Sequence, residues 1–598
     1  MKRISLALAG LITAASAIAT PEPNDFDWST ITPSRKLEYH PCYTEHKCAR
    51  LIVPLDWLDK SNPHTIALAI VKLPAKVPDS DPAFGGSIFT NPGGPGGSGV
   101  TNLLHEGHIY QETADTETRK YEILSWDPRG VQFTSPRADC YEDLFARGTD
   151  AIQRMALGPI GASPDALRRQ WARGQGYGRI CSESAVNGSI IPFASTASVA
   201  RDMVEMLDRI QELRDEEAEA AQGGYDGEDS QKPMQARGEK KPLRLQYWGF
   251  SYGSALGNTF ASMFPGRVGR MIVDGIVDID DYMAGGWLTN LQDTEELVEY
   301  FYKTCHSAGP DKCALARPSD SSSQDIRSRV DDLVARLDAE PIHVLDGKLT
   351  HILTGYDAVN AFTRPLYSPY DAFPRLARRL DDAVRGNYTS LIAKTTESLP
   401  QLDQACAHPN ATAPPSSLGD GGQAVLCGDG EDSTGMSMAE YATYAEKLKE
   451  QSPTFAGYWS QIRLACTGWG VRPKWRYMGP FGTPAHDAAG VEGKPAAPLL
   501  FLSSRLDPVT PLRNARRMSE AHAGSVVVVQ ESAGHCTMAT GSRCTTAVIR
   551  KYLEHGEVPA EETVCEADCG PWDGDACLPS TRGVSIAGLG PPHEMHTW

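Results

Sequence analysis

The sequence predicts an α/β fold: a mostly parallel central sheet with helices on both faces and an inserted, mainly helical cap domain. Three observations support this prediction. Short apolar runs that end at turn residues alternate with helical patterns in the first half of the chain. The alternation stops between about residues 285 and 490 and resumes after 491. Strands that alternate with helices form parallel sheets, because each crossover helix returns the chain to the end of the sheet at which the previous strand began.

Composition limits the classes of protein to which the chain can belong. It has 598 residues, of which 41% are hydrophobic and 22% charged, and this is a globular composition. A wholly disordered chain, a collagen-like fibre and a polytopic membrane protein are therefore excluded. The net charge is −19, which repels phosphate, so we expect no nucleic-acid partner. The same charge disfavours binding to anionic lipid.

Residues 1–19 are typical of a secretory signal peptide. Lys2 and Arg3 precede an apolar run at 4–18, which ends in small residues suited to cleavage. The alternative is a membrane anchor, but the run is short for a membrane span. We therefore expect a secreted, extracellular protein with no membrane contact after signal removal. Three Asn-x-Ser/Thr triplets predict glycosylation on this route, at Asn187, Asn387 and Asn410.

Fourteen cysteines follow the signal, and an even number in a secreted chain predicts disulfides. The predicted pairs are Cys42–Cys48, Cys140–Cys181, Cys305–Cys313, Cys427–Cys466 and Cys536–Cys544. Cys406, Cys565, Cys569 and Cys577 remain without an assigned order. The last three are clustered, but their spacing matches no usual zinc-ligand pattern, so we expect no metal.

The chain divides into segments of different character. The predicted organisation is a signal peptide at 1–19, the first part of the core at 20–284 with a mobile, exposed insertion at 214–241, a helical cap at 285–490, the last part of the core at 491–556 and a cysteine-containing tail at 557–598. The insertion is assigned because residues 214–241 are polar, charged and glycine-containing.

Individual elements follow from hydrophobic periodicity. Short apolar runs bounded by turn residues predict strands at 66–71, 86–90, 122–126, 243–248, 270–273, 498–503 and 525–529. Apolar residues at helical spacing predict helices at 198–213 and 254–264 in the core, and at 291–302, 326–337 and 441–448 in the cap.

Gly249-Phe250-Ser251-Tyr252-Gly253 is the one G-x-S-x-G motif in the chain. It follows a predicted strand and precedes a predicted apolar helix, as a nucleophile elbow requires. Small residues two positions before and after Ser251 relieve crowding in the sharp turn and leave the hydroxyl exposed. The alternative interpretation is a structural glycine-rich turn.

A serine hydroxyl needs a base that accepts its proton, and that base needs an acid that orients it. His535 follows the predicted strand at 525–529, and Asp507 follows the predicted strand at 498–503. The order Ser251, Asp507, His535 is that of an α/β-hydrolase. The alternative for Asp507 is a turn aspartate before a proline, and most lone histidines are surface residues.

The segment Asn91-Pro92-Gly93-Gly94-Pro95-Gly96-Gly97-Ser98-Gly99 directly follows the predicted strand at 86–90. Without Cβ atoms its backbone can approach a substrate closely. We expect the amides of Gly94 and Tyr252 to form an oxyanion hole. A phosphate loop would need a terminal Lys-Ser/Thr pair, which is absent. A dinucleotide site is disfavoured because the chain is predicted to be secreted.

Several separated motifs, in order, resemble one known family. They are the glycine loop, Asp127-Pro128-Arg129-Gly130, WGFSYGSALG, Val273-Asp274-Gly275-Ile276-Val277-Asp278, SSRLDPVTP and GHC. Between about residues 42 and 552 the chain is similar to secreted tripeptidyl-aminopeptidase-like α/β-hydrolases, which are related to proline iminopeptidases. The resemblance implies a serine exopeptidase with a helical cap that recognises a free amino terminus. Ser251, Asp507 and His535 match the catalytic triad of this family.

The sequence departs from the family at Val131-Gln132-Phe133-Thr134-Ser135, in the insertion and in the tail. An aminopeptidase also needs a carboxylate for the substrate ammonium group, and the cap offers Asp293, Glu295, Glu296 and Glu299 without selecting among them.

The sequence therefore predicts a secreted serine hydrolase that acts through an acyl-enzyme, without metal or cofactor. The expected substrate is the N-terminal end of a peptide. One alternative is an esterase or lipase that acts on small esters, because the same residues serve both reactions. A non-catalytic binding module on the same fold is a second alternative.

Overall fold

The computed structural model describes residues 26–574, except for 159, 164, 187, 223–241, 348 and 393–418. The predicted signal peptide at 1–19 and the predicted glycosylation sites Asn187 and Asn410 lie outside the described residues. Within the described part of the chain, no helix is long and apolar enough to cross a bilayer.

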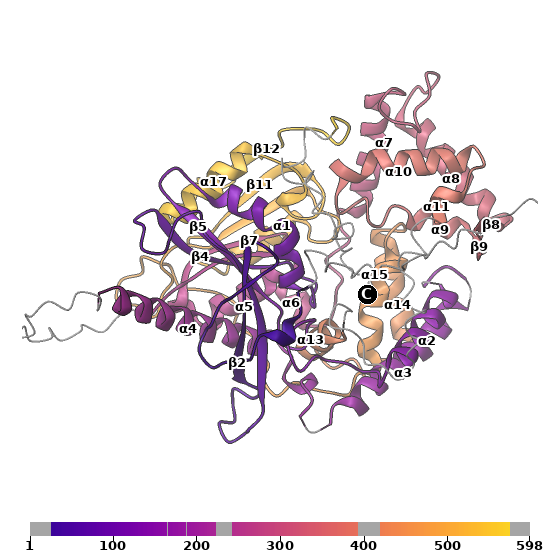
Figure 1. Ribbon diagram of the computed structural model, residues 1–598. Coiled ribbons are helices and arrows are strands. Elements are labelled where there is room, and N and C mark those ends of the chain that lie inside the picture. The colour runs from indigo at the N-terminus through magenta and orange to yellow at the C-terminus, as the bar shows by residue number, and fades with distance from the viewer. Residues whose placement is uncertain are drawn as a thin grey trace, which may run out of the picture.

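A ten-stranded sheet forms the centre of the described chain (Figure 1). The strand order is β1-β2-β3-β5-β4-β6-β7-β10-β11-β12. The first three pairs are antiparallel, and every pair from β5 to β12 is parallel. The strands are β1 His40–Cys42, β2 His46–Pro54, β3 Thr65–Leu73, β4 Phe84–Asn91, β5 Lys120–Trp126, β6 Leu245–Phe250, β7 Val268–Asp274, β10 Leu500–Leu506, β11 Val526–Ala533 and β12 Val564–Glu566. The prediction of a mostly parallel central sheet is confirmed.

Successive residues of the central strands enter two different hydrophobic cores. In β6, Tyr247 belongs to one core, and Trp248 and Phe250 belong to the other. All three are buried, because parallel strands covered on both faces alternate between two apolar layers. This is why these strands appear in the sequence as continuous apolar runs.

Helices cover both faces of the sheet. The helices of the core are α1 Gly99–Ala114, α4 Thr196–Gln222, α5 Tyr252–Met263, α6 Ile279–Met283, α16 Leu512–Ser519 and α17 Arg543–His555. Helices α1 and α17 contact each other and pack on one face, where their apolar residues join the core of Trp248. Helices α4 and α5 contact each other, and their residues join the core of Tyr247 on the opposite face.

The predicted insertion at 214–241 begins inside a helix. Residues 214–222 continue α4, residues 216–220 are exposed as predicted, and residues 223–241 lie outside the described residues. The helix persists because Arg214 hydrogen-bonds to Ser87 and pairs with the buried Glu122, which anchors this part of α4 to the sheet. A second ion pair, between Lys36 and Glu216, joins it to the N-terminal segment.

Between β7 and β10 lies the helical segment predicted as a cap, which occupies the right-hand side of Figure 1. Its elements are α7 Thr294–Ala308, α8 Ser323–Ala339, β8 Ile342–Asp346, β9 Leu349–Leu353, α9 Gly355–Asn360, α10 Pro369–Val384, α11 Thr389–Ile392, α13 Gly421–Asp429, α14 Met438–Gln451, α15 Ala456–Leu464 and the 3₁₀ turn η4 Ala465–Gly468. The antiparallel β8–β9 hairpin was not expected.

A second segment joins this helical region from the first half of the chain. Helices α2 Leu144–Leu157 and α3 Ala166–Ser184 follow β5, and α3 packs against α14, α15 and η4. Two glycines on α3 allow the close approach: a Cβ on Gly174 would lie 2.7 Å from Cγ of Leu464, and a Cβ on Gly178 would lie 2.3 Å from the carbonyl carbon of Gly468. The cap is therefore built from two separate stretches of the sequence.

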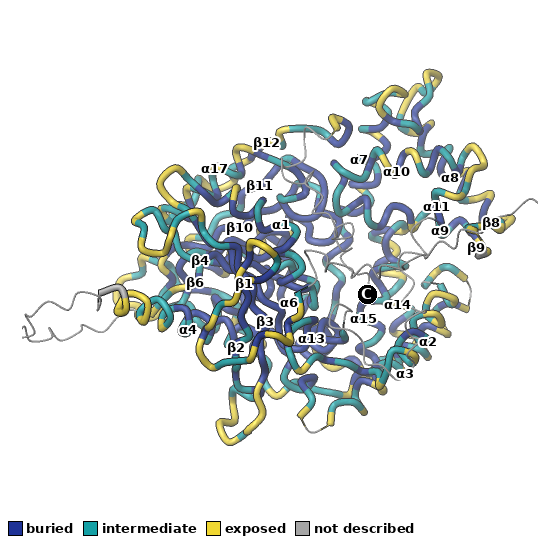
Figure 2. The backbone as a smooth tube through the Cα atoms, in the orientation of Figure 1, coloured by how far each residue is buried: buried dark blue, intermediate teal, exposed yellow. Residues whose placement is uncertain are grey.

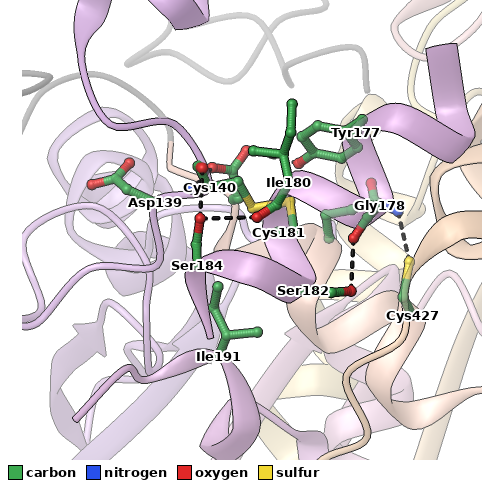
Figure 3. The surroundings of a disulfide bond; sticks show 12 residues. Asp139, Cys140, Tyr177, Gly178, Ile180, Cys181, Ser182, Ser184, Ile191 and Cys427 are labelled. Carbon is green, nitrogen blue, oxygen red and sulfur yellow. Dashed lines mark hydrogen bonds between the residues drawn. A yellow bond between two sulfur atoms is a disulfide. The ribbon is translucent and has the colours of Figure 1, made fainter. Parts of the chain in front are cut away.

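Four of the five predicted disulfides are formed: Cys42–Cys48, Cys140–Cys181, Cys305–Cys313 and Cys427–Cys466. Figure 3 shows the second of these, at the base of α3, where the Ser184 hydroxyl donates to the Cys140 carbonyl at 2.8 Å. The prediction of Cys536–Cys544 is wrong, because Cys544 pairs with Cys565 and joins α17 to β12. Cys536 is a buried free thiol. Cys406 and Cys577 lie outside the described residues.

Burial follows this architecture. In Figure 2 the strands and the inner faces of the surrounding helices are buried, while exposure concentrates in peripheral loops and in the outer helices. The carboxyl ends of β6, β7, β10 and β11 remain buried where the cap meets the sheet, since Asp274, Asp507 and His535 are each less than a tenth exposed. This edge is where the predicted site residues lie.

Candidate active site

Ser251 occupies a sharp turn between β6 and α5. Its backbone is in the left-handed region, with φ 55° and ψ −124°, which is unusual for a residue with a side chain. The turn is held by a hydrogen bond from the Ser251 amide to the Asp274 carbonyl at 2.9 Å, and by Ser254, whose hydroxyl donates to the Ser251 carbonyl. Ser251 is partly exposed, whereas its neighbour Tyr252 is buried. This is the geometry predicted for a nucleophile elbow.

Asp507 and His535 contact each other at the ends of β10 and β11. The Nδ1 atom of His535 lies 3.0 Å from both carboxylate oxygens of Asp507. The same carboxylate accepts from the backbone amides of Val509, Thr510 and Cys536 at 2.8–3.0 Å. Burial alone raises the pKa of Asp507. The charge and hydrogen bond of His535 and the backbone amides outweigh burial, so the pKa lies below its ordinary value.

The other ring nitrogen of His535, Nε2, is buried and has no hydrogen-bond partner among the described residues. A histidine whose Nδ1 contacts a carboxylate and whose Nε2 is free of protein partners can accept a proton at Nε2. Thr510 supplies a third contact to the ring, since its hydroxyl lies 3.1 Å from Nδ1. No sequence pattern indicated Thr510 apart from its proximity to Asp507.

The glycine loop lies directly over the serine turn. A Cβ on Gly93 would lie 2.8 Å from Cβ of Ser251 and 3.0 Å from the amide nitrogen of Tyr252. Gly93 and Gly94 both have positive φ, at 96° and 110°. Tyr252 is the first residue of α5, and amides in the first helical turn have no partner within the helix. The loop therefore brings backbone amides next to a helix N-terminus, beside Ser251.

Asp127 fastens this loop to the sheet. Its carboxylate accepts from the Ser98 hydroxyl at 2.6 Å and from the amides of Val100 and Phe133 at 3.1 and 2.9 Å. Burial raises the pKa of Asp127 to about 6, although these hydrogen bonds lower it. The role of Asp127 in its sequence motif is therefore to hold the glycine loop in position.

Arg129, two residues later, has a different role. Its guanidinium makes a two-point contact with Asp202 at 2.5 and 2.7 Å and donates to the carbonyls of Pro54 and Leu55. Both charged side chains are fully buried. This buried pair joins β2 to α4 and to the segment after β5.

Replacing Gly93 with alanine is expected to lower kcat at least about 100-fold, the loss typical for one misplaced oxyanion donor. The added Cβ would overlap Ser251 and the Phe250 carbonyl, so the loop must move away from the serine. Gly386→Ala is the matched control, because Gly386 also has positive φ, at 91°, but a Cβ there meets no atom within 4 Å. Steady-state kinetics and thermal melting of both variants check this. Equal activity of the two variants would contradict the placement of the loop.

The cap contacts both the Asp507 loop and the His535 loop, and sequence reasoning missed these contacts. The Tyr367 carbonyl accepts from the His535 amide at 2.9 Å, and the Tyr367 ring meets the imidazole edge-on at 5.2 Å. On the other loop, Asn290 and Thr294 donate to the carbonyls of Val509 and Pro508 at 2.8 and 2.7 Å. The position of His535 therefore depends on the cap as well as on the sheet.

A buried polar cluster joins the cap to Tyr252. Asp429, at the end of α13, accepts from the amide and hydroxyl of Thr196 and from the Tyr282 hydroxyl at 2.5–3.0 Å. The Thr196 hydroxyl also contacts the hydroxyl of Tyr252. Burial raises the pKa of Asp429, against these hydrogen bonds. The side chain of Tyr252 is thus linked to a carboxylate of the cap through Thr196.

Three of the four cap carboxylates considered for substrate binding have protein partners. Asp293 pairs with Arg513 at 2.5 Å, and Glu295 accepts from Ser452 and Thr454 at 2.7 and 3.0 Å. Glu299 pairs with Arg327. Glu296 is exposed. These interactions explain why the cap helix α7 is acidic without invoking a substrate.

One group of possible metal ligands occurs in the described part of the chain. It consists of Asp507, His535 and Cys536, whose donor atoms lie within 4.8 Å of one another. Their atoms already have other contacts. The Cys536 thiol lies 3.4 Å from the Asp274 carbonyl, and burial raises its pKa well above the ordinary value. A thiol kept protonated is a poor metal ligand.

Comparison with known proteins identifies several relatives of this chain. Residues 452–565 match a family model described as TAP-like protein. The chain is 25% identical over 546 residues to the tripeptidyl aminopeptidase of Streptomyces lividans, which covers 88% of this chain and 84% of that protein. It is 24% identical over 530 residues to the serine protease Hip1 of Mycobacterium tuberculosis, which covers 87% of each protein. A shorter match of 162 residues, 31% identical, covers 26% of this chain and 28% of carboxylesterase B from Mycobacterium tuberculosis.

Proposed function

We propose that this chain, a serine hydrolase of the TAP-like α/β-hydrolase family, is a secreted exopeptidase that releases short peptides or residues from free N-termini. The observation that carries the proposal is the buried Asp507–His535 pair beside the strained Ser251 turn, beneath a glycine loop. Similarity to a tripeptidyl aminopeptidase over 88% of the chain supports a peptide as the substrate.

In the proposed mechanism Ser251, Asp507 and His535 are the catalytic residues. The Ser251 oxygen attacks the scissile carbonyl carbon while its proton moves to Nε2 of His535. Asp507 stabilises the resulting imidazolium through Nδ1. The imidazolium then gives the proton to the leaving amine, and the acyl group stays on Ser251. Water, deprotonated by the same Nε2, releases the acyl product and restores the enzyme.

The amides of Gly94 and Tyr252 hold the negative oxygen of each tetrahedral intermediate in this mechanism. Each such donor contributes roughly 3 kcal/mol to the transition state. The close approach of Gly93 to Ser251 and to the Tyr252 amide supports this assignment. No metal or cofactor is needed, because proton transfer and the oxyanion are handled by the chain itself.

The secretory part of the proposal rests on the N-terminal sequence and the disulfides. Five disulfides are formed among the described residues, which fits an oxidising compartment. Of the three proposed glycosylation sites, Asn187, Asn387 and Asn410, the structure describes Asn387. It is exposed in a turn after α10, and its side-chain oxygen accepts from the Thr389 amide at 3.3 Å.

Hydrolysis of small esters is the second candidate function. The observation that favours it is the 31% identity to a carboxylesterase over 162 residues. The two functions share the same nucleophile, base and acid, so they differ in what binds beyond the scissile bond.

Purified secreted protein should be tested on four substrates: a free-amine tripeptide chromogenic amide, a single-residue amide, the N-acetylated tripeptide amide and a short-chain ester. We expect cleavage of free-amine peptides and a rate at least about 100-fold lower on the acetylated peptide. A site that binds the substrate ammonium group is left without its partner when that group is acetylated, and such sites discriminate strongly. The Ser251→Ala protein provides the blank. Equal rates on acetylated and free peptides, or cleavage of the ester alone, would contradict the exopeptidase proposal.

A further inference from the structure

We propose that Asp274 is a positioning residue for the reaction: it joins the serine turn to the histidine loop and supplies a second carboxyl group beside the imidazolium that forms on His535. The inference rests on the proposed roles of Ser251 and His535. Asp274 ends β7, the strand between those that lead to Ser251 and to Asp507. Its side chain is fully buried.

The backbone of Asp274 contacts both sides of the site. Its carbonyl accepts the amide of Ser251 at 2.9 Å, which fixes the strained turn. The Cys536 thiol approaches the same carbonyl at 3.4 Å. Gly275, the next residue, packs tightly against the thiol, since a Cβ on Gly275 would lie 2.5 Å from the Cys536 sulfur. Cys536, the residue after His535, is therefore packed against the same carbonyl group that accepts the Ser251 amide.

The side chain of Asp274 fixes the histidine loop at its other end. One carboxylate oxygen accepts the Thr537 amide at 2.7 Å, and the other accepts the Thr537 hydroxyl at 2.6 Å. Asp507 accepts the Cys536 amide on the preceding residue. Two carboxylates from neighbouring strands thus hold consecutive amides of the loop, and the orientation of the imidazole depends on both.

Asp274 is a fully buried carboxyl group beside a second buried carboxyl group, Asp507. Among the described residues no Lys or Arg pairs with Asp274 or Asp507. The titratable groups that face Asp274 are Asp507 at the end of β10, and His535 and Cys536 in the loop after β11. Burial raises the pKa of Asp274 to about 7, Thr537 opposes the rise, and the negative charge of Asp507 adds to it.

This pKa couples Asp274 to the base. As the pH rises through about 7, Asp274 ionises and places a second negative charge near the imidazole. A nearby negative charge stabilises the imidazolium that forms during the reaction. Asparagine at this position can keep a hydrogen bond to the Thr537 amide but stays neutral at every pH.

The test measures the rate of active-site labelling by a fluorophosphonate, and kcat and KM on the best substrate, each as a function of pH. Labelling needs the serine and its base but no amino-terminal recognition, so its result does not depend on the peptidase proposal. We expect Asp274→Asn to label about tenfold more slowly at pH 8, with kcat reduced and KM unchanged, and the midpoint of the rising limb moved to lower pH.

A pair of variants at Thr537 separates position from charge. Thr537→Ser keeps the hydroxyl and is expected to label at nearly the wild-type rate, whereas Thr537→Val loses that hydrogen bond and is expected to label several-fold more slowly. Both variants keep the ionisable carboxyl group of Asp274, which Asp274→Asn removes, although loss of the Thr537 hydroxyl raises the pKa of Asp274 further. Asp274→Asn with the wild-type rate and midpoint, or Thr537→Val indistinguishable from Thr537→Ser, would overturn the proposal.

Folding stability gives an independent readout of the Asp274 carboxyl. The pKa of Asp274 is about 7 in the folded protein, against the ordinary value of 3.8, so between these pH values the folded state binds more protons. This residue therefore lowers the free energy of unfolding as the pH rises from about 4 to about 7. The fall in melting temperature between pH 5 and pH 8 is expected to be smaller in Asp274→Asn. An equal fall in both proteins would contradict the buried, uncompensated carboxyl.

Discussion

Ser251→Ala is expected to reduce kcat about 10⁵- to 10⁶-fold on any substrate that the enzyme cleaves, the range seen when a serine nucleophile is removed. The substitution removes only the hydroxyl group, and Ser251 is the single residue between β6 and α5. The variant should fold normally, because the turn is held by backbone hydrogen bonds from Ser251 to Asp274 and from Ser254. Single-turnover kinetics and labelling by a fluorophosphonate measure the loss.

Ser262→Ala is the matched control for this experiment. Ser262 lies on the same helix, α5, and its hydroxyl accepts the Gly482 amide at 3.0 Å, away from the turn. It is expected to cost about 1 kcal/mol of stability and no activity. If Ser251→Ala kept more than roughly one hundredth of the activity and still reacted with the fluorophosphonate, the nucleophile would be another residue.

Asp507→Asn is expected to lower kcat about 10⁴-fold at neutral pH. An amide at this position can donate to Nδ1 of His535, which leaves the proton on Nε2, so the ring can no longer accept the serine proton. The imidazolium also loses its partner charge. His535→Ala should be at least as inactive, and the two losses should not add, because the residues act as one unit.

Asp293→Asn tests whether the effect is specific to Asp507. Asp293 is also a mostly buried acid in contact with a basic side chain, Arg513. It lies on the cap side of the site and is expected to change stability by about 1 kcal/mol without a large loss of kcat. A loss in Asp293→Asn comparable to that in Asp507→Asn would point to Asp293 as a substrate-binding carboxylate. Steady-state kinetics of the two variants, with melting curves, distinguish these outcomes.

The strands of the parallel region were predictable from the sequence because each depends on local composition. The apolar run at 243–248, for example, became β6 Leu245–Phe250, and the runs at 498–503 and 525–529 became β10 and β11. Strands β1 and β2 were missed, since β2 lies in the antiparallel part of the sheet, its buried residues alternate mostly with partly buried ones, and its apolar run is only three residues long. Helices α2 and α3 were missed as part of the cap because they precede it by more than a hundred residues.

The positions of Ser251, Asp507 and His535 also followed from order along the chain. Each was placed after a predicted strand, and the carboxyl ends of parallel strands meet at one edge of a sheet. The contacts around them did not follow from sequence. Asp274, Thr510 and Tyr367 lie far from one another or from His535 in the chain, and ordinary residue types at ordinary spacings carry no signal of contact.

Local periodicity and motif order therefore determined the fold class, the mostly parallel sheet and the loops that carry the candidate site. Tertiary structure decided which cysteine pairs with Cys544, which cap carboxylates have partners, and that Asp274 joins the serine turn to the histidine loop. The physical reason is that strands and turns are formed by neighbours in sequence. Disulfides, ion pairs and buried carboxylates depend on distances of a few ångströms between segments that only the packed chain brings together.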